Sequence, residues 1–278
     1  RFQGAVLTNI RPEHLEAHGS FERNREAKLE FFRELARSPK VDRIAVVNRD
    51  DASAHFFVEA ADMPGVQIVS VSARARAEEL ELSGAWVKVP VNRENAALAA
   101  AYAETEGLPR HLVRSALDAF PGVPGRLEYV QERPFAVVVD YAHTPDSLAR
   151  LYEFLKSAHR GRLICVLGAA GGGRDKWKRP EMGRVAAEFC DEVVLTNEDP
   201  YDEDPMAILS EIESGITNGR TPTKVMERRE ALAHALSLAR PHDVVVATGK
   251  GSETSIHLAR GKTIPWSERG EMEKLLSQ

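Results

Sequence analysis

Short apolar runs alternate with amphipathic stretches through the second half of the chain. Glycine, aspartate or asparagine borders the runs at 135–139, 163–167, 193–195 and 244–247. Helices are predicted near 145–158, 180–190, 205–216, 228–240 and 268–276, three of them opened by a capping residue at Thr144, Asp204 or Ser267. This order predicts an α/β fold with a Rossmann-like, doubly wound and mostly parallel sheet, in which ligands bind beyond the carboxyl ends of the strands.

The first half of the chain is less regular and predicts a separate, partial domain. Strands are expected over 2–8, 44–47 and 68–71, with helices near 20–37, 93–106 and 109–119. The segment Pro-Gly-Val-Pro-Gly at 121–125 extends neither flanking element, because proline and glycine both interrupt regular structure. We therefore predict two domains, 1–124 and 125–278. The chain opens with Arg1 directly before an apolar strand, so we expect further residues to precede it.

Composition and charge argue against several classes of protein. The 278 residues carry 37 Lys and Arg against 42 Asp and Glu, a net charge of −5, which predicts no nucleic-acid or anionic-membrane partner. No apolar run reaches transmembrane length and no signal peptide is visible. We expect a cytoplasmic protein and a monomer. Cys165 and Cys190 each lie in an apolar run, which favours buried, reduced thiols over a disulfide or a metal site.

Lys28 is the charged side chain on the apolar stripe of the helix near 20–37. Phe21, Phe32 and Leu35 lie at offsets of −7, +4 and +7 from it, and so share its helical face. A lysine there either extends its amine past the edge of the stripe or keeps it buried, and a buried, neutral amine can take up carbon dioxide as a carbamate. His14, among carboxylates upstream, is either a ligand of a divalent cation or a plain surface residue.

Polar clusters follow four of the predicted strands, at the end where such a sheet binds ligands. The first cluster, Asp140-Tyr141-Ala142-His143, offers a carboxylate for ribose hydroxyls and an imidazole for phosphate. The glycine-rich loop at 168–173 runs into Arg174 and further cations, and is either an anion-binding loop or a flexible turn. The acidic run at 196–204 and the segment at 248–253 follow the other two strands. Together these patches suit a substrate that carries both an amine and a carboxylate.

A series of motifs, in a fixed order, resembles the Mur ligase family. The motifs are the segments at 8–9, 14–19, 27–28, 48–51 (Asn-x-Asp-Asp), 92–100, 125–128 (Gly-Arg-Leu-Glu), 140–145 (Asp-Tyr-Ala-His-Thr-Pro) and 171–183. Each motif alone is weak, but their joint order covers nearly the whole chain and is specific. More narrowly, the chain resembles the branch that adds the third amino acid to the cell-wall peptide precursor.

The resemblance implies an activity and the residues that carry it. ATP would phosphorylate the carboxylate of UDP-N-acetylmuramoyl-dipeptide, and the amine of a free diamino acid would displace phosphate from the resulting acyl phosphate. The residues at the metal and nucleotide would be His14 and a carbamylated Lys28 at Mg2+, Asn95 at adenine, Asp140 at the ribose, and Arg126 and His143 at the phosphates. Lys28, Arg126 and His143 would act on phosphoryl transfer. The residues at the amino acid would be Arg174 at its carboxylate, and Asp199 and Glu253 at its side-chain amine.

Departures from the family pattern refine these expectations. The family's Gly-Lys-Thr phosphate loop and UDP-binding domain are absent, so we expect the chain alone to be inactive. Tyr201 stands where diaminopimelate-adding members carry arginine, and tyrosine cannot form a bidentate fork with a carboxylate. Asp199 adds a negative charge beside it, and Ser252 stands where histidine is common. These differences favour lysine or another basic amino acid over meso-diaminopimelate.

Two rival functions stay open. One is another amide ligase of the same superfamily, of the folylpolyglutamate or cyanophycin synthetase type, although the motifs at 140–145 and 174–180 favour the wall ligase. The other is a non-catalytic module that holds a nucleotide or peptide without turnover. A Gly-Lys-Thr loop encoded upstream would support the enzyme over the module.

Overall fold

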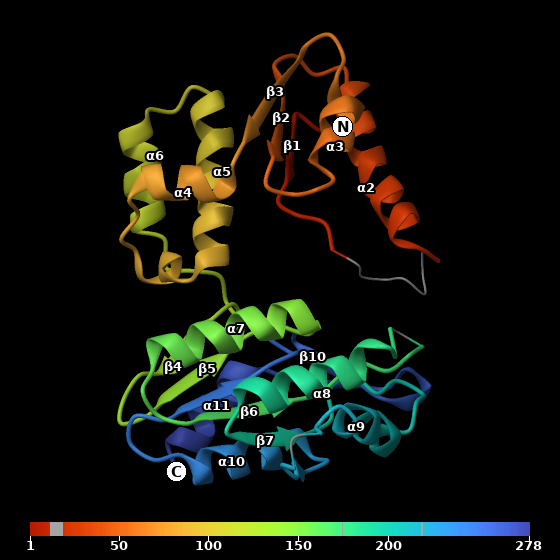
Figure 1. The fold of residues 1–278 in the computed structure, drawn as a ribbon, viewed down its shortest axis with the longest axis vertical. Helices are drawn as coiled ribbons and strands as arrows, with labels where there is room; N and C mark the ends of the chain where they lie inside the picture. Colours follow the sequence, from red (N-terminus) through yellow and green to blue (C-terminus); the bar gives the residue numbers. More distant parts are fainter. Residues whose placement is uncertain (12–18, 174, 218) are drawn as a thin grey trace. The chain divides into compact units, whose positions relative to one another are not determined.

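Two separate sheets organise the chain, one in Arg1–Gly122 (unit 1) and one in Val123–Gln278 (unit 2) (Figure 1). The structure, a computed structural model, describes residues 1–11, 19–173, 175–217 and 219–278. Each unit has its own hydrophobic clusters, so each is described by itself.

Unit 1 is built on a three-stranded parallel sheet in the order β1-β2-β3. The strands are β1 (Gly4–Leu7), β2 (Arg43–Asn48) and β3 (Val66–Val71). The central strand β2 is buried on both faces, because Ala45 and Val47 pack into one cluster while Ile44 and Val46 pack into another. This is the continuous apolar run expected of a parallel strand with helices on both sides.

Helices cover both faces of the sheet of unit 1. They are α2 (Phe21–Ala36), α3 (Ala54–Ala61), α4 (Ala73–Leu80), α5 (Pro90–Thr105) and α6 (Arg110–Asp118), with a 3-10 turn η1 (Ala85–Lys88). Leu29 of α2 and Phe57 of α3 join the cluster on one face, and Leu98 of α5 joins the cluster on the other. The predicted strands and the helices α2, α5 and α6 are confirmed. The sequence pattern missed α3 and α4, which have eight residues each.

Unit 2 contains a six-stranded sheet in the order β4-β5-β9-β6-β7-β8. Its strands are β4 (Glu128–Gln131), β5 (Ala136–Val139), β6 (Leu163–Leu167), β7 (Glu192–Leu195), β8 (Thr223–Lys224) and β9 (Val244–Ala247). Only the pairing of β4 with β5 is antiparallel among the described ladders of this sheet. The predicted doubly wound, mostly parallel sheet is therefore confirmed. A two-stranded hairpin, β10 (Ser255–His257) and β11 (Thr263–Pro265), follows β9.

The helices of unit 2 lie in two layers, with α7, α8 and α9 on one face of the sheet and α10 and α11 on the other (Figure 1). They are α7 (Pro145–Ala158), α8 (Lys178–Phe189), α9 (Pro205–Glu213), α10 (Arg228–Leu238) and α11 (Glu268–Leu276). The three predicted helix starts are confirmed, because the side chains of Thr144, Asp204 and Ser267 each accept a hydrogen bond from a first-turn amide.

The prediction of reduced thiols is wrong. Cys165, inside β6, and Cys190, directly after α8, are joined by a disulfide, with their Cα atoms 6.1 Å apart. Both are buried, as expected. Because α8 packs on the sheet, its C-terminal end lies near β6, the strand that precedes it. Two cysteines that are 25 residues apart in the sequence are thereby brought into contact. Sequence patterns around each cysteine do not contain that contact.

No helix within the described ranges is both long enough and apolar enough to cross a bilayer.

Candidate ligand site at the carboxyl ends of the strands

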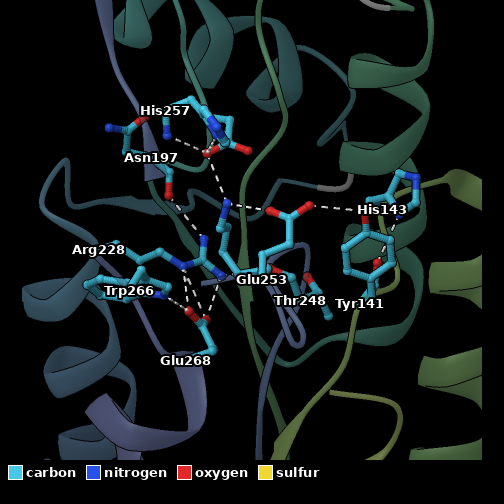
Figure 2. A network of polar contacts seen from close by, with 11 residues as sticks. Tyr141, His143, Asn197, Arg228, Thr248, Glu253, His257, Trp266 and Glu268 are labelled. Carbon is cyan, nitrogen blue, oxygen red and sulfur yellow. Dashed lines mark hydrogen bonds and ion pairs between the residues drawn. The ribbon is translucent and has the colours of Figure 1, made fainter. Parts of the chain in front are cut away.

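Three polar clusters meet at one edge of the sheet of unit 2. They are the segments that follow β5, β7 and β9, and they begin at Asp140, Thr196 and Thr248. In the sheet order β5-β9-β6-β7 these strands are parallel, so their carboxyl ends lie at the same edge. The side chains there form one network of polar contacts (Figure 2).

Lys250 is the centre of this network. Its side chain is 0% exposed, and its Nζ donates to Oδ1 of Asp199 at 2.9 Å and to Oε2 of Glu253 at 2.5 Å. The other oxygen of Glu253 accepts from the hydroxyl of Tyr141 at 3.0 Å. One lysine and one carboxylate therefore connect the segments after β5, β7 and β9.

Asp199 and Glu253 differ in what they offer to a ligand. Oδ1 of Asp199 also accepts from the backbone N–H of His257 at 2.8 Å, and only 6% of the Asp199 side chain is exposed. Its charge is thus matched within the protein. The side chain of Glu253 is 36% exposed, so a ligand can reach this carboxylate. The role of either residue at a substrate amine stays a prediction.

Tyr201 packs against an imidazole that the sequence analysis missed. Its ring stacks on that of His257, with centroids 5.2 Å apart and an interplanar angle of 16°. The backbone of Tyr201 has φ 51°, and its N–H donates to the carbonyl of His257 at 3.3 Å. His257 lies on β10, a strand that had no sequence signal of its own, so nothing in the pattern placed it beside Tyr201.

Asp140, Arg126 and His143 lie together around Tyr141. The two oxygens of Asp140 accept from the backbone N–H groups of Leu127 at 2.6 Å and Ala142 at 2.7 Å. Burial raises the pKa of Asp140, while these two bonds and Arg126 act against the increase. The Arg126 guanidinium lies 4.1 Å from the centroid of the Tyr141 ring. Nδ1 of His143 donates to the carbonyl of Tyr141 at 2.9 Å.

Glu198 is a buried carboxyl with one oxygen, Oε2, that has no hydrogen-bond partner among the described residues. Burial raises its pKa, and the cations Arg228, Lys250 and Lys178 act in the opposite direction. Gly249 makes room for it, since a Cβ there would lie 2.2 Å from Oε2 of Glu198. The first two carboxylates of the acidic run after β7, Glu198 and Asp199, are therefore buried, whereas Asp202 and Asp204 are exposed as in a solvated loop.

The glycine-rich loop after β6 is fastened by Glu203. Its oxygens accept from the N–H of Gly173 at 2.7 Å and from Nη1 of Arg179 at 3.1 Å, and Lys176 pairs with it at 3.0 Å. Burial acts to raise the pKa of Glu203, but these three donors outweigh it and lower the pKa to about 2. Arg174, the predicted carboxylate-binding residue, lies outside the described residues.

Unit 1 holds the other predicted residues. Lys28 is exposed, in agreement with the alternative in which its amine extends past the edge of the apolar stripe, and its role at a metal stays a prediction. Four of the five buried residues of α2 lie from Leu29 onward, and in the first half of the helix Asn24 is buried and Phe21 packs, partly buried, against the same core. Asn95 is exposed on α5, which covers the other face of the sheet. His14, the predicted metal ligand, lies outside the described residues, and within the described ranges no group of three or more His, Cys, Asp or Glu is arranged for a metal ion.

Sequence comparison gives the class of protein that this fold and site define. Residues 1–100 match the family model described as the Mur ligase middle domain. Residues 125–251 match the model described as the Mur ligase, glutamate ligase domain. The two matches together cover most of the chain, which belongs to the Mur ligase family.

Individual relatives of the chain are enzymes of one branch of this family, judged by their names. The chain is 36% identical over 310 residues to UDP-N-acetylmuramyl-tripeptide synthetase of Roseiflexus sp., with 100% of this chain and 60% of that protein covered. It is 38% identical over 297 residues to UDP-N-acetylmuramoyl-L-alanyl-D-glutamate--2,6-diaminopimelate ligase of Gloeobacter violaceus, with the same coverage. The chain thus spans about 60% of the length of these relatives.

Solved structures agree on the fold. A UDP-N-acetylmuramoyl-L-alanyl-D-glutamate--2,6-diaminopimelate ligase aligns with a TM-score of 0.54 and 26% identity, covering 99% of this chain and 60% of that one. MurF from Acinetobacter baumannii aligns with a TM-score of 0.67 and 20% identity, covering 99% and 59%. At this lower identity the second match concerns the fold alone.

Proposed function

We propose that the protein containing this chain is an ATP-dependent amide ligase that adds a diamino acid to UDP-N-acetylmuramoyl-L-alanyl-D-glutamate. The observation that carries the proposal is the Lys250 network, which joins three strand ends at the ligand-binding edge of a sheet in a Mur ligase domain. A module that only supports the fold has no need of a buried lysine between two carboxylates at that edge, because such burial is costly.

The proposed reaction has two steps. The carboxylate of the dipeptide substrate attacks the γ-phosphorus of ATP, forming an acyl phosphate and releasing ADP. The neutral amine of the amino acid then attacks the acyl carbon, an amide bond forms, and inorganic phosphate leaves. The incoming ammonium loses one proton before its attack and the new amide nitrogen loses a second. Glu253 is proposed to bind the side-chain amine, since its carboxylate is accessible and fixed by Tyr141 and Lys250.

The residues of unit 2 suit the nucleotide that this reaction needs. Asp140 is a carboxylate acceptor for ribose hydroxyls. Arg126 is a donor of the kind that phosphate oxygens accept from, and His143, whose Nδ1 bonds Tyr141, would donate from Nε2 when its ring is protonated. In unit 1, Asn95 is proposed near adenine. For Mg2+, His14 and a carbamylated Lys28 stay the proposed ligands. Bound Mg2+ would neutralise charge on the transferred phosphate.

Tyr201 supports lysine or ornithine over meso-diaminopimelate as the amino acid. Its ring is stacked on His257 and offers a face rather than two parallel N–H donors to the far end of the substrate. Diaminopimelate is the amino acid named for several relatives, and that name applies to those proteins. For this protein we propose a substrate with a cationic side chain, and a monomer that acts in the cytoplasm.

Phosphate release by the full-length protein tests the proposal. The assay contains UDP-N-acetylmuramoyl-dipeptide, ATP and Mg2+, with lysine, ornithine or meso-diaminopimelate as the amino acid. We expect turnover with lysine or ornithine to exceed turnover with diaminopimelate, and Tyr201→Arg to shift the preference toward diaminopimelate. Tyr201→Phe is the matched control, because it keeps the ring and should keep the selectivity. Equal or faster turnover with diaminopimelate in the unaltered protein would refute the assignment, and no turnover with any amino acid would refute the ligase.

A further inference from the structure

A buried ion pair lies next to the Lys250 network. Arg228, at the start of α10, and Glu268, at the start of α11, have side chains that are 1% and 0% exposed. Nε of Arg228 donates to both oxygens of Glu268, at 2.9 and 3.1 Å, and Nη2 donates to Oε1 at 2.6 Å. Trp266 adds a bond from its Nε1 to Glu268 at 2.6 Å (Figure 2). The carboxylate is therefore well satisfied within the protein.

Arg228 also binds backbone at two strand ends. Its Nη1 donates to the carbonyl of Asn197 at 3.0 Å, and its Nη2 donates to the carbonyl of Thr248 at 2.7 Å. Asn197 follows β7 and Thr248 follows β9, and these strands are second neighbours because β6 lies between them. The guanidinium thus spans the width of one strand and fixes two segments that no shared ladder holds together.

The residues that meet in the network lie two positions beyond each of these carbonyls. Asp199 follows Asn197 by two residues, and Lys250 follows Thr248 by two residues. Their side chains pair at 2.9 Å in the interior. The fork of Arg228 therefore bridges the two backbones from which this pair is built, in addition to the bonds that each backbone makes to β6.

We propose that Arg228 is a positioning residue for the amino-acid end of the site, acting on Asp199, Lys250 and Glu253 through the carbonyls of Asn197 and Thr248. The inference rests on the proposed function for its kinetic consequence. An arginine that served only to pair with Glu268 would not need Nη1, which bonds outside that pair. A small displacement of a substrate-binding group lowers catalytic efficiency by up to about a hundredfold, so loss of the fork is consequential.

The test compares two variants of the full-length protein. Arg228→Met with Glu268→Met replaces the buried pair by apolar side chains of similar volume, a change that is often neutral for stability. Arg228→Lys keeps the charge beside Glu268 but loses the fork. Arg162→Met is the matched control, because Arg162 also binds a carboxylate (Asp243) and a carbonyl (Leu238), at the opposite ends of β6 and β9.

Two measurements decide the proposal. In steady-state kinetics we expect both Arg228 variants to raise KM for the amino acid on the order of tenfold, with KM for ATP within about twofold. The Arg162→Met control should keep both constants. Independently of activity, an amine-reactive acetylating reagent followed by peptide mass spectrometry reports the exposure of Lys250. We expect Lys250 to be protected in the unaltered protein and in Arg162→Met, and modified in the folded Arg228 variants.

The outcomes separate the positioning role from the function. Folded Arg228 variants with an unchanged KM for the amino acid and a protected Lys250 would overturn the positioning role. If the unaltered protein lacks ligase activity, the proposed function fails while acetylation still decides whether Arg228 positions Lys250. If Arg228→Met with Glu268→Met does not fold, the same two readouts on Arg228→Lys decide.

Discussion

Replacing Glu203 by glutamine should destabilise the protein by an amount that depends strongly on pH. Glu203 joins the N–H of Gly173, the guanidinium of Arg179 and the amine of Lys176, and its pKa falls from 4.5 to about 2. One pKa unit is worth about 1.4 kcal/mol, so the full shift corresponds to about 3 kcal/mol of unfolding free energy. Because 21% of the side chain is exposed, solvent screening reduces this to about 2–3 kcal/mol.

The stabilisation by Glu203 decreases at low pH because the unfolded state binds the proton more tightly than the folded state. The folded-state pKa of Glu203 is depressed, so its contribution is fully present above the unfolded value of 4.5 and is lost as pH falls toward 2. At pH 7 the loss in Glu203→Gln should be about 2–3 kcal/mol, and at pH 3 about 1 kcal/mol, because Glu203 is then mostly protonated in the unfolded state while it is still mostly ionised in the folded state.

Urea unfolding at pH 7 and pH 3 measures both differences. Glu188→Gln is the matched control, because Glu188 pairs with Arg184 on an exposed part of α8 and should change stability little at either pH. An equal loss at pH 7 and pH 3 in Glu203→Gln would refute the reasoning, since the effect would then come from packing rather than from charge. Glu203→Gln also weakens the hydrogen bond from the N–H of Gly173, so it should raise KM for the amino acid if Arg174 binds the amino-acid carboxylate.

Two further predictions concern the interior of unit 2. The chain should show no reactive thiol when it is denatured without reduction and two when it is reduced, and two thiols before reduction would contradict the disulfide. Changing both Cys165 and Cys190 to alanine should lower the unfolding free energy by about 3 kcal/mol. Lys250→Met should lower the unfolding free energy by about 3–5 kcal/mol at pH 7, because both carboxylate partners of a buried amine lose their cation. Urea unfolding checks this, and an unchanged midpoint would contradict the pairing.

The sequence predicted the architecture of unit 2 because the relevant information is local. Each of β5, β6, β7 and β9 is an apolar run with polar borders, and Thr144, Asp204 and Ser267 bond the helix starts that their positions suggest. Parallel strands end at one edge, so the meeting of three polar clusters there also followed from the pattern.

The pairing inside the site could not be predicted, since it depends on strand order. Lys250 reaches Asp199 because β9 is inserted between β5 and β6, and periodicity does not encode that insertion. The stacking of His257 on Tyr201 and the disulfide could not be predicted either, because each joins segments that are far apart in the sequence. The exposure of Lys28 was undecided for another reason. Helical phase gives the face on which a side chain lies but not how deeply that side chain is buried.

The charges of the Lys250 network bear on which amino acid the site accepts. Lys250 supplies one positive charge to two carboxylates, so the group of Lys250, Asp199 and Glu253 has a net charge of −1 when all three are ionised. The far end of lysine or ornithine is an ammonium with charge +1, whereas the far end of diaminopimelate carries an ammonium and a carboxylate that sum to zero. Burying a net charge without a partner is costly, so the ammonium complements this site and the zwitterion leaves its charge unmatched. Tyr201 lacks the carboxylate-binding fork of an arginine and the Lys250 group has a net negative charge, so two independent features of the site favour the same class of substrate.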